Sequence, residues 1–475
     1  MRWKTTFILL TVTIAIGAYV ALYEIKQPSP EFQRLRTSQV VRIPRDEVTE
    51  ITIQGPKSQV VLSREGQTWQ LGTPRVRADG EFVQALLSET TSLMSERVLS
   101  GSPEQPLELK AFGLDPPAAR LTLVANTTPT TLLFGASTAV RENRYVQVEG
   151  RPEIFVVSSG LFDRLDQPAE VFRDPLLIRL ESWRTDELTV TSVDGTLILV
   201  RHDDDWRLTQ PFTDRADRAE VGAFLSHLSG LRIKRFVDDA PTAEQLSTWG
   251  LDHPTLEVML SEGEPRIQRT LVFGASVADD ASLVYAKRSD EPSLYAVASE
   301  DLQALRRDPH GLRATTCFEF FTSQVRKAEL TTEGAGWTIE RAQDQWRATG
   351  SSAVLDAGQV ERWLSQLADL RLSGFEDDAP TALSRYGLDP PSAIVAVWTM
   401  VHQEPQRLFV GATLPESTNR YGRIEGRDAV VRLPALIAEL LGTTLDNLGP
   451  PDRTGSSKGR TEEASPQGES TVDTP

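Results

Sequence analysis

The sequence contains few of the residues on which disulfide, metal and thiol chemistry depends. Its 475 residues include one cysteine, Cys317, and five histidines. A single cysteine excludes an intrachain disulfide and a thiolate zinc site, and the N-terminal region has no cysteine for a lipoprotein anchor. The histidines lack the short spacings that are typical of histidine metal sites. Cys317 stands beside aromatic residues, which favours a buried structural thiol.

Acidic residues outnumber basic ones, and common nucleotide-binding motifs are absent from the sequence. The formal net charge is −17 and the pI is about 4.9, which disfavours a nucleic-acid partner. The sequence has no P-loop and no Gly-x-Gly-x-x-Gly motif. We therefore predict no catalytic residue, no cofactor and no metal site.

An uncharged stretch at the N-terminus predicts a membrane anchor. Arg2 and Lys4 precede residues 5–23, which as a helix would reach about 28 Å, close to the thickness of a membrane core. The alternative is a cleaved signal peptide, because residues 15–17 have a small-x-small pattern. The apolar run continues past that pattern, so we predict a single-pass, uncleaved anchor in the inner membrane. A short basic tail is typical of export signals, and the body is therefore expected in the periplasm or its equivalent.

The rest of the chain is built on a repeat. An aromatic residue followed by Gly-Leu-Asp occurs three times, and its glycines are 137 residues apart in both steps. The three copies are Gly113-Leu114-Asp115, Gly250-Leu251-Asp252 and Gly387-Leu388-Asp389. Two further sets of landmarks keep nearly the same period, namely Trp69, Trp206 and Trp346, and the glycines Gly135, Gly274 and Gly411. Such a period indicates tandem structural modules.

Each copy predicts the same elements in the same order. Alternating strands come first, then a strand with the tryptophan, then an amphipathic helix with Asp79, Asp217 or Asp356 as its N-cap. Glu220 and Gln359 would complete a capping box in the second and third copies. A short helical segment then ends at the turn glycine, which suits a left-handed conformation. Two hairpins and a closing helix follow.

The strands alternate apolar and polar residues, which is typical of antiparallel sheets with helices on one face. The predicted fold class is α+β, with three tandem repeats, each an antiparallel sheet packed with one or two helices, behind one N-terminal transmembrane helix. The predicted ranges are an anchor at 1–24, a linker at 25–44, modules at 45–174, 175–314 and 315–448, and a disordered tail at 449–475.

These motifs resemble the domain of unknown function (DUF) 4340 family. The resemblance rests on the tryptophan strand, the aromatic-Gly-Leu-Asp turn, the Phe-Gly-Ala-Ser string and the tyrosine hairpin, in about three copies over residues 45–445. It implies a bacterial protein with one N-terminal transmembrane segment, whose gene often accompanies a gliding-type ABC transport system. The family has no established activity. The first copy departs from the others because it lacks the Asp-Asp-Ala-Pro string of residues 238–241 and 377–380.

The best candidates for a ligand site are two repeated aspartate pairs. The pairs are Asp238 with Asp239 and Asp377 with Asp378. Carboxylate oxygens suit calcium, so these residues could bind a cation. The alternative is that they cap the short helical segment that follows them.

Three weaker candidates have ordinary structural alternatives. The turn aspartates Asp115, Asp252 and Asp389 precede proline or His-Pro, which indicates turn formation before catalysis. The string at residues 202–205 could bind a metal or form a polar hairpin turn. The hairpin tyrosines Tyr145, Tyr285 and Tyr421 could form a binding stripe or be half-buried strand aromatics.

The function that the sequence favours is a non-enzymatic, membrane-anchored envelope protein that acts as a scaffold or binding subunit. The resemblance suggests that it is accessory to a gliding-type ABC transport system. The expected partners are the inner membrane, through residues 5–23, and a protein, with no nucleic acid. The alternative is an envelope hydrolase, or a glycan- or cation-binding protein, that uses loop carboxylates.

Overall fold

The computed structural model describes residue 3 and residues 38–450, apart from 73–74, 103, 140–141, 204, 264, 335, 344, 351–353 and 402. The predicted anchor at residues 5–23 and nearly all of the predicted tail lie outside the described residues. Among the helices that are described, none is both long enough and apolar enough to cross a lipid bilayer.

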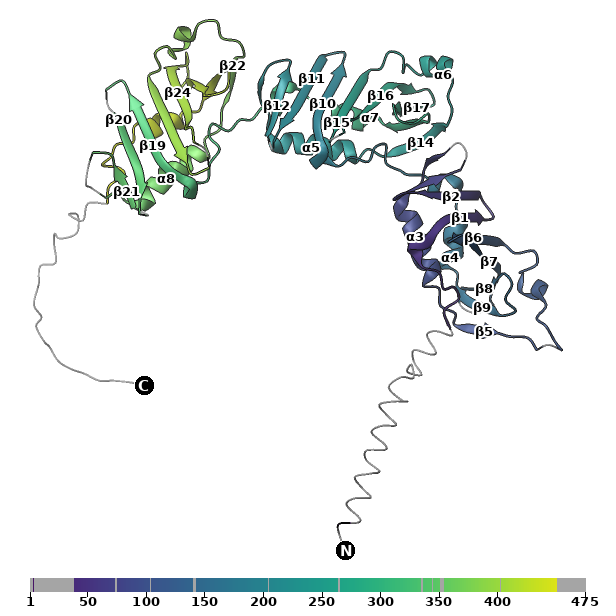
Figure 1. The fold of residues 1–475 in the computed structure, drawn as a ribbon. Helices are drawn as coiled ribbons and strands as arrows, with labels where there is room; N and C mark the ends of the chain where they lie inside the picture. Colours follow the sequence, from purple (N-terminus) through teal and green to yellow (C-terminus); the bar gives the residue numbers. More distant parts are fainter. Residues whose placement is uncertain are drawn as a thin grey trace, which may run out of the picture. The chain divides into compact units, whose positions relative to one another are not determined.

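Each of the three modules contains one antiparallel sheet with helices, so the fold is α+β as predicted (Figure 1). Module 1 contains β1 (Val48–Gln54), β2 (Gln59–Glu65), β3 (Thr68–Leu71), β4 (Val76–Arg77), β5 (Arg97–Leu99), β6 (Ala119–Ala125), β7 (Thr128–Ser137), β8 (Asn143–Val148) and β9 (Ile154–Ser158). Its helices are α3 (Gly80–Thr91) and α4 (Gly160–Leu165), with 3₁₀ turns η2 (Arg45–Glu47), η3 (Leu109–Phe112) and η4 (Ala169–Phe172).

Module 2 repeats these elements. Its strands are β10 (Thr185–Ser192), β11 (Gly195–His202), β12 (Asp205–Gln210), β13 (Asp214–Arg215), β14 (Ile233–Asp238), β15 (Leu256–Glu262), β16 (Ile267–Val277), β17 (Asp280–Arg288) and β18 (Leu294–Ala298). Its helices are α5 (Arg218–Ser229), α6 (Ala243–Thr248) and α7 (Ser299–Leu305), with 3₁₀ turns η5 (Ser182–Arg184) and η6 (Pro309–Leu312).

Within the described residues, which leave out 351–353, module 3 has one strand fewer. Its strands are β19 (Val325–Thr332), β20 (Gly336–Ala342), β21 (Gln345–Ala348), β22 (Gly374–Asp377), β23 (Ala393–Thr399), β24 (Gln406–Thr413), β25 (Arg420–Ile424) and β26 (Val430–Leu433). Its helices are α8 (Ala357–Ala368) and α9 (Leu436–Leu441), with 3₁₀ turns η7 (Thr322–Gln324) and η8 (Leu383–Tyr386).

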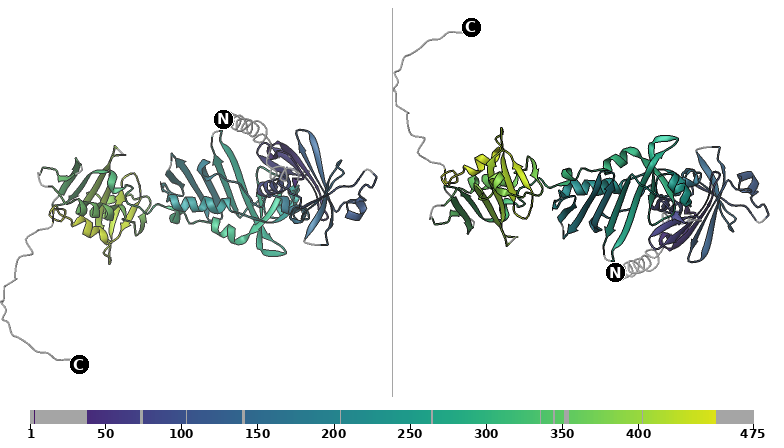
Figure 2. Two further views of the ribbon diagram at one scale, coloured as in Figure 1. Left: turned by 90° about the horizontal axis from the view of Figure 1, so that it is seen from below. Right: turned by 90° about the horizontal axis from the view of Figure 1, so that it is seen from above.

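The strand order explains why one long helix covers each sheet. The orders are β4-β3-β2-β1-β6-β7-β8-β9-β5, then β13-β12-β11-β10-β15-β16-β17-β18-β14, then β21-β20-β19-β23-β24-β25-β26-β22. In module 1, α3 connects β4 at one edge to β5 at the other, so the helix has to cross a face of the sheet. Figure 2 shows a long helix on one face of the sheet of module 2, while the turn that follows α6 packs on the other face, where Trp249 and Leu251 meet Leu283, Tyr285 and Leu294.

The apolar periodicity of the sequence determines these faces. In β1, Ile51 and Ile53 are buried while their neighbours are more exposed, as expected for a strand with one covered face. The long helix of module 3 buries Val360, Trp363, Leu364 and Leu367, which have helical spacing. Burying each side chain of this size stabilises the fold by roughly 1.5–3 kcal/mol.

The predicted N-caps are present, but the predicted capping boxes are not. The side chain of Asp356 accepts a hydrogen bond from the backbone N–H of Gln359 at 2.9 Å. In a capping box the Asp356 N–H would bond to the Gln359 side chain, but it donates to the Leu448 carbonyl at 2.8 Å. The N–H of Asp217 likewise donates to Leu312. A backbone carbonyl near the end of each module thus accepts the hydrogen bond of the N-cap N–H, in place of the Glu or Gln side chain of a capping box.

An extended segment leads into each module and becomes part of it. Residues 38–40, 173–177 and 313–317 form these lead-in segments. In module 3, the Cys317 N–H donates to Leu370 at 3.2 Å and the Leu372 N–H donates to Thr315 at 2.8 Å. On its other side the same segment bonds to module 2, because the Ala314 N–H donates to the Arg215 carbonyl at 2.9 Å. The lead-in segment is therefore shared by the two modules that it connects.

The chain divides into two compact units, and each lead-in segment of modules 2 and 3 lies inside one of them. The first unit contains residues 173–177 together with Phe224–Arg306. The second unit contains Gly195–Ala223 and the chain from Arg307 onward. We call the contacts around residues 173–177 junction 1 and those around residues 313–317 junction 2.

Candidate functional site

The repeated Gly-Leu-Asp turn packs against the repeated Phe-Gly-Ala-Ser string. In module 2, Gly250 has a φ of +71°, as a left-handed helix stop requires. The Ala275 N–H donates to the Trp249 carbonyl at 2.9 Å, and a Cβ at Gly274 would lie 2.2 Å from that oxygen. The turn glycines of the other modules have φ values of +66° at Gly113 and +64° at Gly387. Both motifs therefore serve the packing inside a module.

The hairpin tyrosines stack on the aromatic residue that precedes each turn glycine. The ring centroids are 5.0 Å apart for Phe112 and Tyr145, 5.4 Å for Trp249 and Tyr285, and 5.1 Å for Tyr386 and Tyr421. Such offset or edge-on pairs stabilise a fold beyond the area that they bury. These tyrosines are strand aromatics with partners inside their own module, which is the structural alternative that the sequence offered.

The turn aspartates Asp115, Asp252 and Asp389 are exposed, each in the turn of its own module. In module 2, the Ser247 hydroxyl donates to Asp252 Oδ2 at 2.7 Å. This hydrogen bond lowers the pKa of Asp252 below its usual range. A local hydrogen bond of this kind agrees with the turn-forming role that the sequence indicates. At the polar string, His202 at the end of β11 pairs with Asp205 at the start of β12, and residue 204 lies outside the described residues.

In each aspartate pair, the first aspartate accepts a hydrogen bond from a backbone N–H of the loop in which it stands. Asp238 accepts a hydrogen bond from the Ala240 N–H at 2.9 Å. Asp377 accepts one from the Ala379 N–H at 3.1 Å and one from the Tyr386 hydroxyl at 2.7 Å. The capping alternative is wrong for these aspartates, because Thr242 caps helix α6 and the 3₁₀ turn η8 has no side-chain cap.

The second member of each pair does contact a cation, but the cation is an arginine of the chain. Asp239 accepts Arg173 Nη2 at 2.5 Å, and Asp378 accepts Arg313 Nη1 at 2.5 Å. Both arginines belong to lead-in segments. Among the described residues, no group of three or more His, Cys, Asp and Glu side chains is placed to hold a metal ion.

A phenylalanine completes each of these arginine contacts. The guanidinium carbon of Arg173 lies 4.0 Å from the ring centroid of Phe236, and that of Arg313 lies 3.5 Å from the ring centroid of Phe375. A guanidinium over an aromatic face is attracted by the ring quadrupole. We call the phenylalanine and the second aspartate of each module its arginine socket. In module 1 the corresponding strand carries Val98 and Leu99.

Junction 2 adds a fully buried carboxylate. Asp214 in β13 accepts Arg313 Nε at 2.5 Å, Arg427 Nε at 2.6 Å and Arg427 Nη2 at 2.9 Å. The side chains of Asp214 and Arg313 are both 1% exposed. Burial alone would raise the pKa of Asp214, but the hydrogen bond and charge of Arg427 and the charge of Arg313 outweigh it. The pKa of Asp214 therefore lies below its usual range, and the carboxylate is charged at neutral pH.

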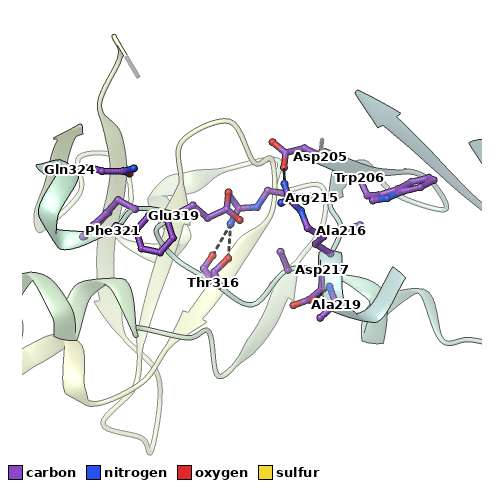
Figure 3. A pocket seen from close by; sticks show the side chains of 13 residues that line it. Asp205, Trp206, Arg215, Ala216, Asp217, Ala219, Thr316, Glu319, Phe321 and Gln324 are labelled. Carbon is purple, nitrogen blue, oxygen red and sulfur yellow. Dashed lines mark hydrogen bonds and ion pairs between the residues drawn. The ribbon is translucent and has the colours of Figure 1, made fainter. Parts of the chain in front are cut away.

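A cleft of about 550 Å³ lies beside junction 2, within the second unit. Figure 3 shows Arg215 extending across it toward Thr316 and Glu319, with Phe321 and Gln324 at one side. Arg215 Nη2 donates to the Thr316 hydroxyl at 2.7 Å, and Arg215 Nη1 lies 3.1 Å from Glu319 Oε2. The charged residues in the middle of the cleft are therefore paired with each other.

Exposed apolar side chains occur at this cleft and on the loop whose backbone bonds to the cleft residue Gln324. Phe321 lines it and is 73% exposed, and Met400 and Val401 are 67% and 63% exposed. The Met400 N–H donates to the Gln324 carbonyl at 2.9 Å, and the Gln324 N–H donates to the Phe321 carbonyl at 2.9 Å. These bonds place the loop of Met400 and Val401 beside the turn from Phe321 to Gln324, and we call the three exposed residues the apolar cluster. Exposed clusters of large apolar residues are typical of interaction surfaces.

Comparison with known families agrees with this architecture. The model of the domain of unknown function DUF4340 matches residues 69–206, 206–355 and 346–449. The three matches cover most of the chain, and the protein therefore belongs to the DUF4340 family, with three tandem copies of its domain. No curated protein matches the sequence.

Sequence reasoning missed the residues that complete the sockets. Arg173 and Arg313 are 140 residues apart, and Phe236 and Phe375 are 139 apart, so both pairs follow the repeat period. The period could have identified them as shared structural positions. No local pattern marks Asp214, because its partners Arg313 and Arg427 are 99 and 213 residues away in sequence.

Proposed function

We propose that this protein is a non-enzymatic scaffold that binds a protein partner outside the cytoplasm while residues 5–23 hold it in the inner membrane. The observation that carries the proposal is the apolar cluster, in which Phe321 lines the cleft beside junction 2 while Met400 and Val401 stand on the loop that bonds to Gln324. Aromatic and methionine side chains are enriched in protein interfaces, where a few of them dominate the binding energy.

The proposal assigns no catalysis to the shared carboxylates, because each set has a structural partner. Asp238 and Asp377 hold their own loops, and Asp239 and Asp378 bind arginines. A carboxylate that performs acid–base chemistry requires access to a substrate and a suitably shifted pKa. The rival proposal of a hydrolase, or of a glycan- or cation-binding protein, would require these side chains to leave their present partners.

The partner class that the family suggests is a component of a gliding-type ABC transport system. The acidic character of the chain, with a formal net charge of −17, favours a partner whose contact surface is apolar with a basic rim. Long-range electrostatic attraction would then bring the partner to the protein, and apolar contact at Phe321 would stabilise the complex.

Site-specific photocrosslinking in native membranes tests the proposal. A photoreactive amino acid at Phe321 should give a covalent adduct with one membrane-associated protein, which mass spectrometry would identify. The matched control is the same amino acid at Val193, which is 81% exposed but lies away from the described cleft lining. Equal adducts at both positions, or none at Phe321, would contradict a binding role for the apolar cluster. Identification of an ABC transport component would support the finer proposal.

The location has a separate test. A reporter enzyme that is active only outside the cytoplasm, fused after Pro450, should be active, and N-terminal sequencing of the mature protein should still find residues 5–23. Activity of a cytoplasmic reporter at the same position would overturn the location. A mature protein that begins near Ala18 would overturn the anchor.

A further inference from the structure

The side chain of Arg313 contacts two aromatic rings and two carboxylates. Its guanidinium carbon is 3.5 Å from the ring centroid of Phe375 and 4.4 Å from that of Phe212. Asp214 accepts its Nε and Asp378 accepts its Nη1, both at 2.5 Å. Two aromatic rings and two carboxylates thus surround one planar cation, which matches the shape and the charge of a guanidinium group.

The four residues come from both sides of junction 2. Phe212 and Asp214 belong to the β12–β13 end of module 2, while Phe375 and Asp378 follow the long helix of module 3. Arg313 itself stands in the lead-in segment, whose backbone bonds to both modules. The guanidinium is therefore the group at which side chains of the two modules meet.

We propose that Phe212, Phe375, Asp214 and Asp378 form a guanidinium-binding box, and that the guanidinium of Arg313 in this box couples module 3 to the end of module 2. The inference does not depend on the partner proposed above. It assigns to Asp378 a ligand, a guanidinium, in place of the metal cation that its sequence context suggested.

Geometry favours a guanidinium over other cations. An ammonium group is a compact, strongly hydrated point charge, whereas a guanidinium is planar, weakly hydrated and able to stack on a ring. The side chains of Asp214 and Arg313 are 1% exposed, so the bound cation has to lose its water. Loss of water costs more for an ammonium group, and the box should therefore discriminate between the two.

The single cysteine provides a native probe of the coupling. Cys317 lies in the same lead-in segment as Arg313, it is 2% exposed, and burial raises the pKa of its thiol to about 12. A thiol reagent should therefore label it slowly while junction 2 is intact. Opening of the junction should expose the segment and speed the labelling.

The test compares labelling rates of Cys317 in the full-length chain and its variants. Arg313→Ala should raise the rate at least tenfold, and millimolar methylguanidinium should slow it again by occupying the vacated box. Methylammonium at the same concentration should have no such effect, and Arg313→Lys should remain fast. Neither compound should change the labelling of the unaltered protein.

Three results would overturn the proposal. Arg313→Ala could label as slowly as the unaltered protein, which would mean that the box does not couple the modules. Arg313→Lys could label slowly, which would mean that charge alone suffices. Methylguanidinium could fail to slow Arg313→Ala, which would exclude a guanidinium site.

A milder variant keeps the test decisive if Arg313→Ala does not fold. Phe212→Leu preserves apolar volume and both carboxylates but removes one of the two rings. We expect it to fold and to label Cys317 several-fold faster than the unaltered protein. A rate equal to that of the unaltered protein would show that the guanidinium does not require the second ring.

Discussion

The two junctions use the same socket but differ in what surrounds it. In both, an arginine at the end of one module contacts a phenylalanine and an aspartate of the next. Junction 2 adds Asp214 and Arg427, which are buried with Arg313. At the position of Asp214, module 1 has Val76, since Leu71 pairs with Val76 as Leu208 pairs with Asp214. At this position of the sheet, module 2 therefore has a buried carboxylate where module 1 has a buried apolar side chain.

In junction 1 the buried carboxylate belongs to the lead-in segment, whereas in junction 2 it belongs to strand β13. Asp174 has a side chain that is 2% exposed, and it accepts Arg179 Nε at 2.7 Å with Arg77 Nη1 at 3.6 Å. Asp239, the aspartate of the socket, is 38% exposed in this junction. Both junctions therefore share the socket, whereas the buried ion pairs around the socket differ between them.

The largest expected effect is the loss of the buried carboxylate of junction 2. Asp214→Val introduces the residue of module 1 but leaves Arg313 and Arg427 without their common partner. An uncompensated buried charge costs about 3–5 kcal/mol, and we expect a loss of that size in the free energy of unfolding. Urea unfolding followed by tryptophan fluorescence would measure it. A change below about 1 kcal/mol would show that water reaches these arginines.

A second change should restore part of that loss. Arg427→Leu in the Asp214→Val background removes the charge that has lost its carboxylate partner, since Arg313 still pairs with Asp378, and it fills the space with an apolar side chain. Apolar replacement of a buried ion pair is often neutral, so we expect the double variant to be more stable than Asp214→Val by about 1–3 kcal/mol. A double-mutant cycle on the same unfolding measurement provides the test. Simple additivity of the two single changes would contradict direct coupling between Asp214 and Arg427.

Acid should weaken junction 2 through Asp214. The pKa of an unfolded aspartate is about 3.9, and that of Asp214 in the folded protein is lower. The stabilisation is therefore fully present above the unfolded value and is lost as the pH falls through the folded value. We expect the stability difference between the unaltered protein and Asp214→Asn to be constant from pH 7 to about pH 5 and to shrink below about pH 4. A difference that shrinks already between pH 7 and pH 6 would contradict the lowered pKa.

The socket aspartates are similarly exposed, at 38% for Asp239 and 34% for Asp378, so Asp239 should matter less than the buried Asp214. Asp239→Ala removes a carboxylate that is 38% exposed, so solvent screens its attraction to Arg173. We expect a loss of about 0.5–1 kcal/mol, which should decrease at high salt. Thermal unfolding at low and high ionic strength would measure both features. A loss as large as that of Asp214→Val would mean that the two junctions do not differ in the way their burial indicates.

A turn aspartate outside both junctions should have the smallest effect. Asp252→Asn keeps an acceptor for the Ser247 hydroxyl, so we expect unchanged thermal unfolding and unchanged crosslinking at Phe321. If folding and membrane level stay unchanged but the crosslink is lost, the charge itself is required. The enzymatic or cation-binding alternative would then regain support.

Sequence periodicity was sufficient for the elements inside a module. Helix α8 follows from Val360, Trp363, Leu364 and Leu367, because each of these side chains has to face the sheet at helical spacing. The left-handed turn at Gly250 follows from its place after a short helix. The capping boxes were predicted wrongly, because the acceptor for the Asp356 N–H comes from Leu448, far away in the sequence.

The sequence by itself determined the three modules, their α+β class and their family, because local periodicity and a constant repeat distance carry that information. Only the tertiary structure decided which residues hold the modules together. The cation that Asp378 binds is Arg313, and Arg427 reaches Asp214 across 213 residues. Burial makes these contacts strong, since a low-dielectric surrounding strengthens the attraction between opposite charges and makes an unpaired charge costly. Burial is a property of the folded chain, and no local pattern of residues encodes it.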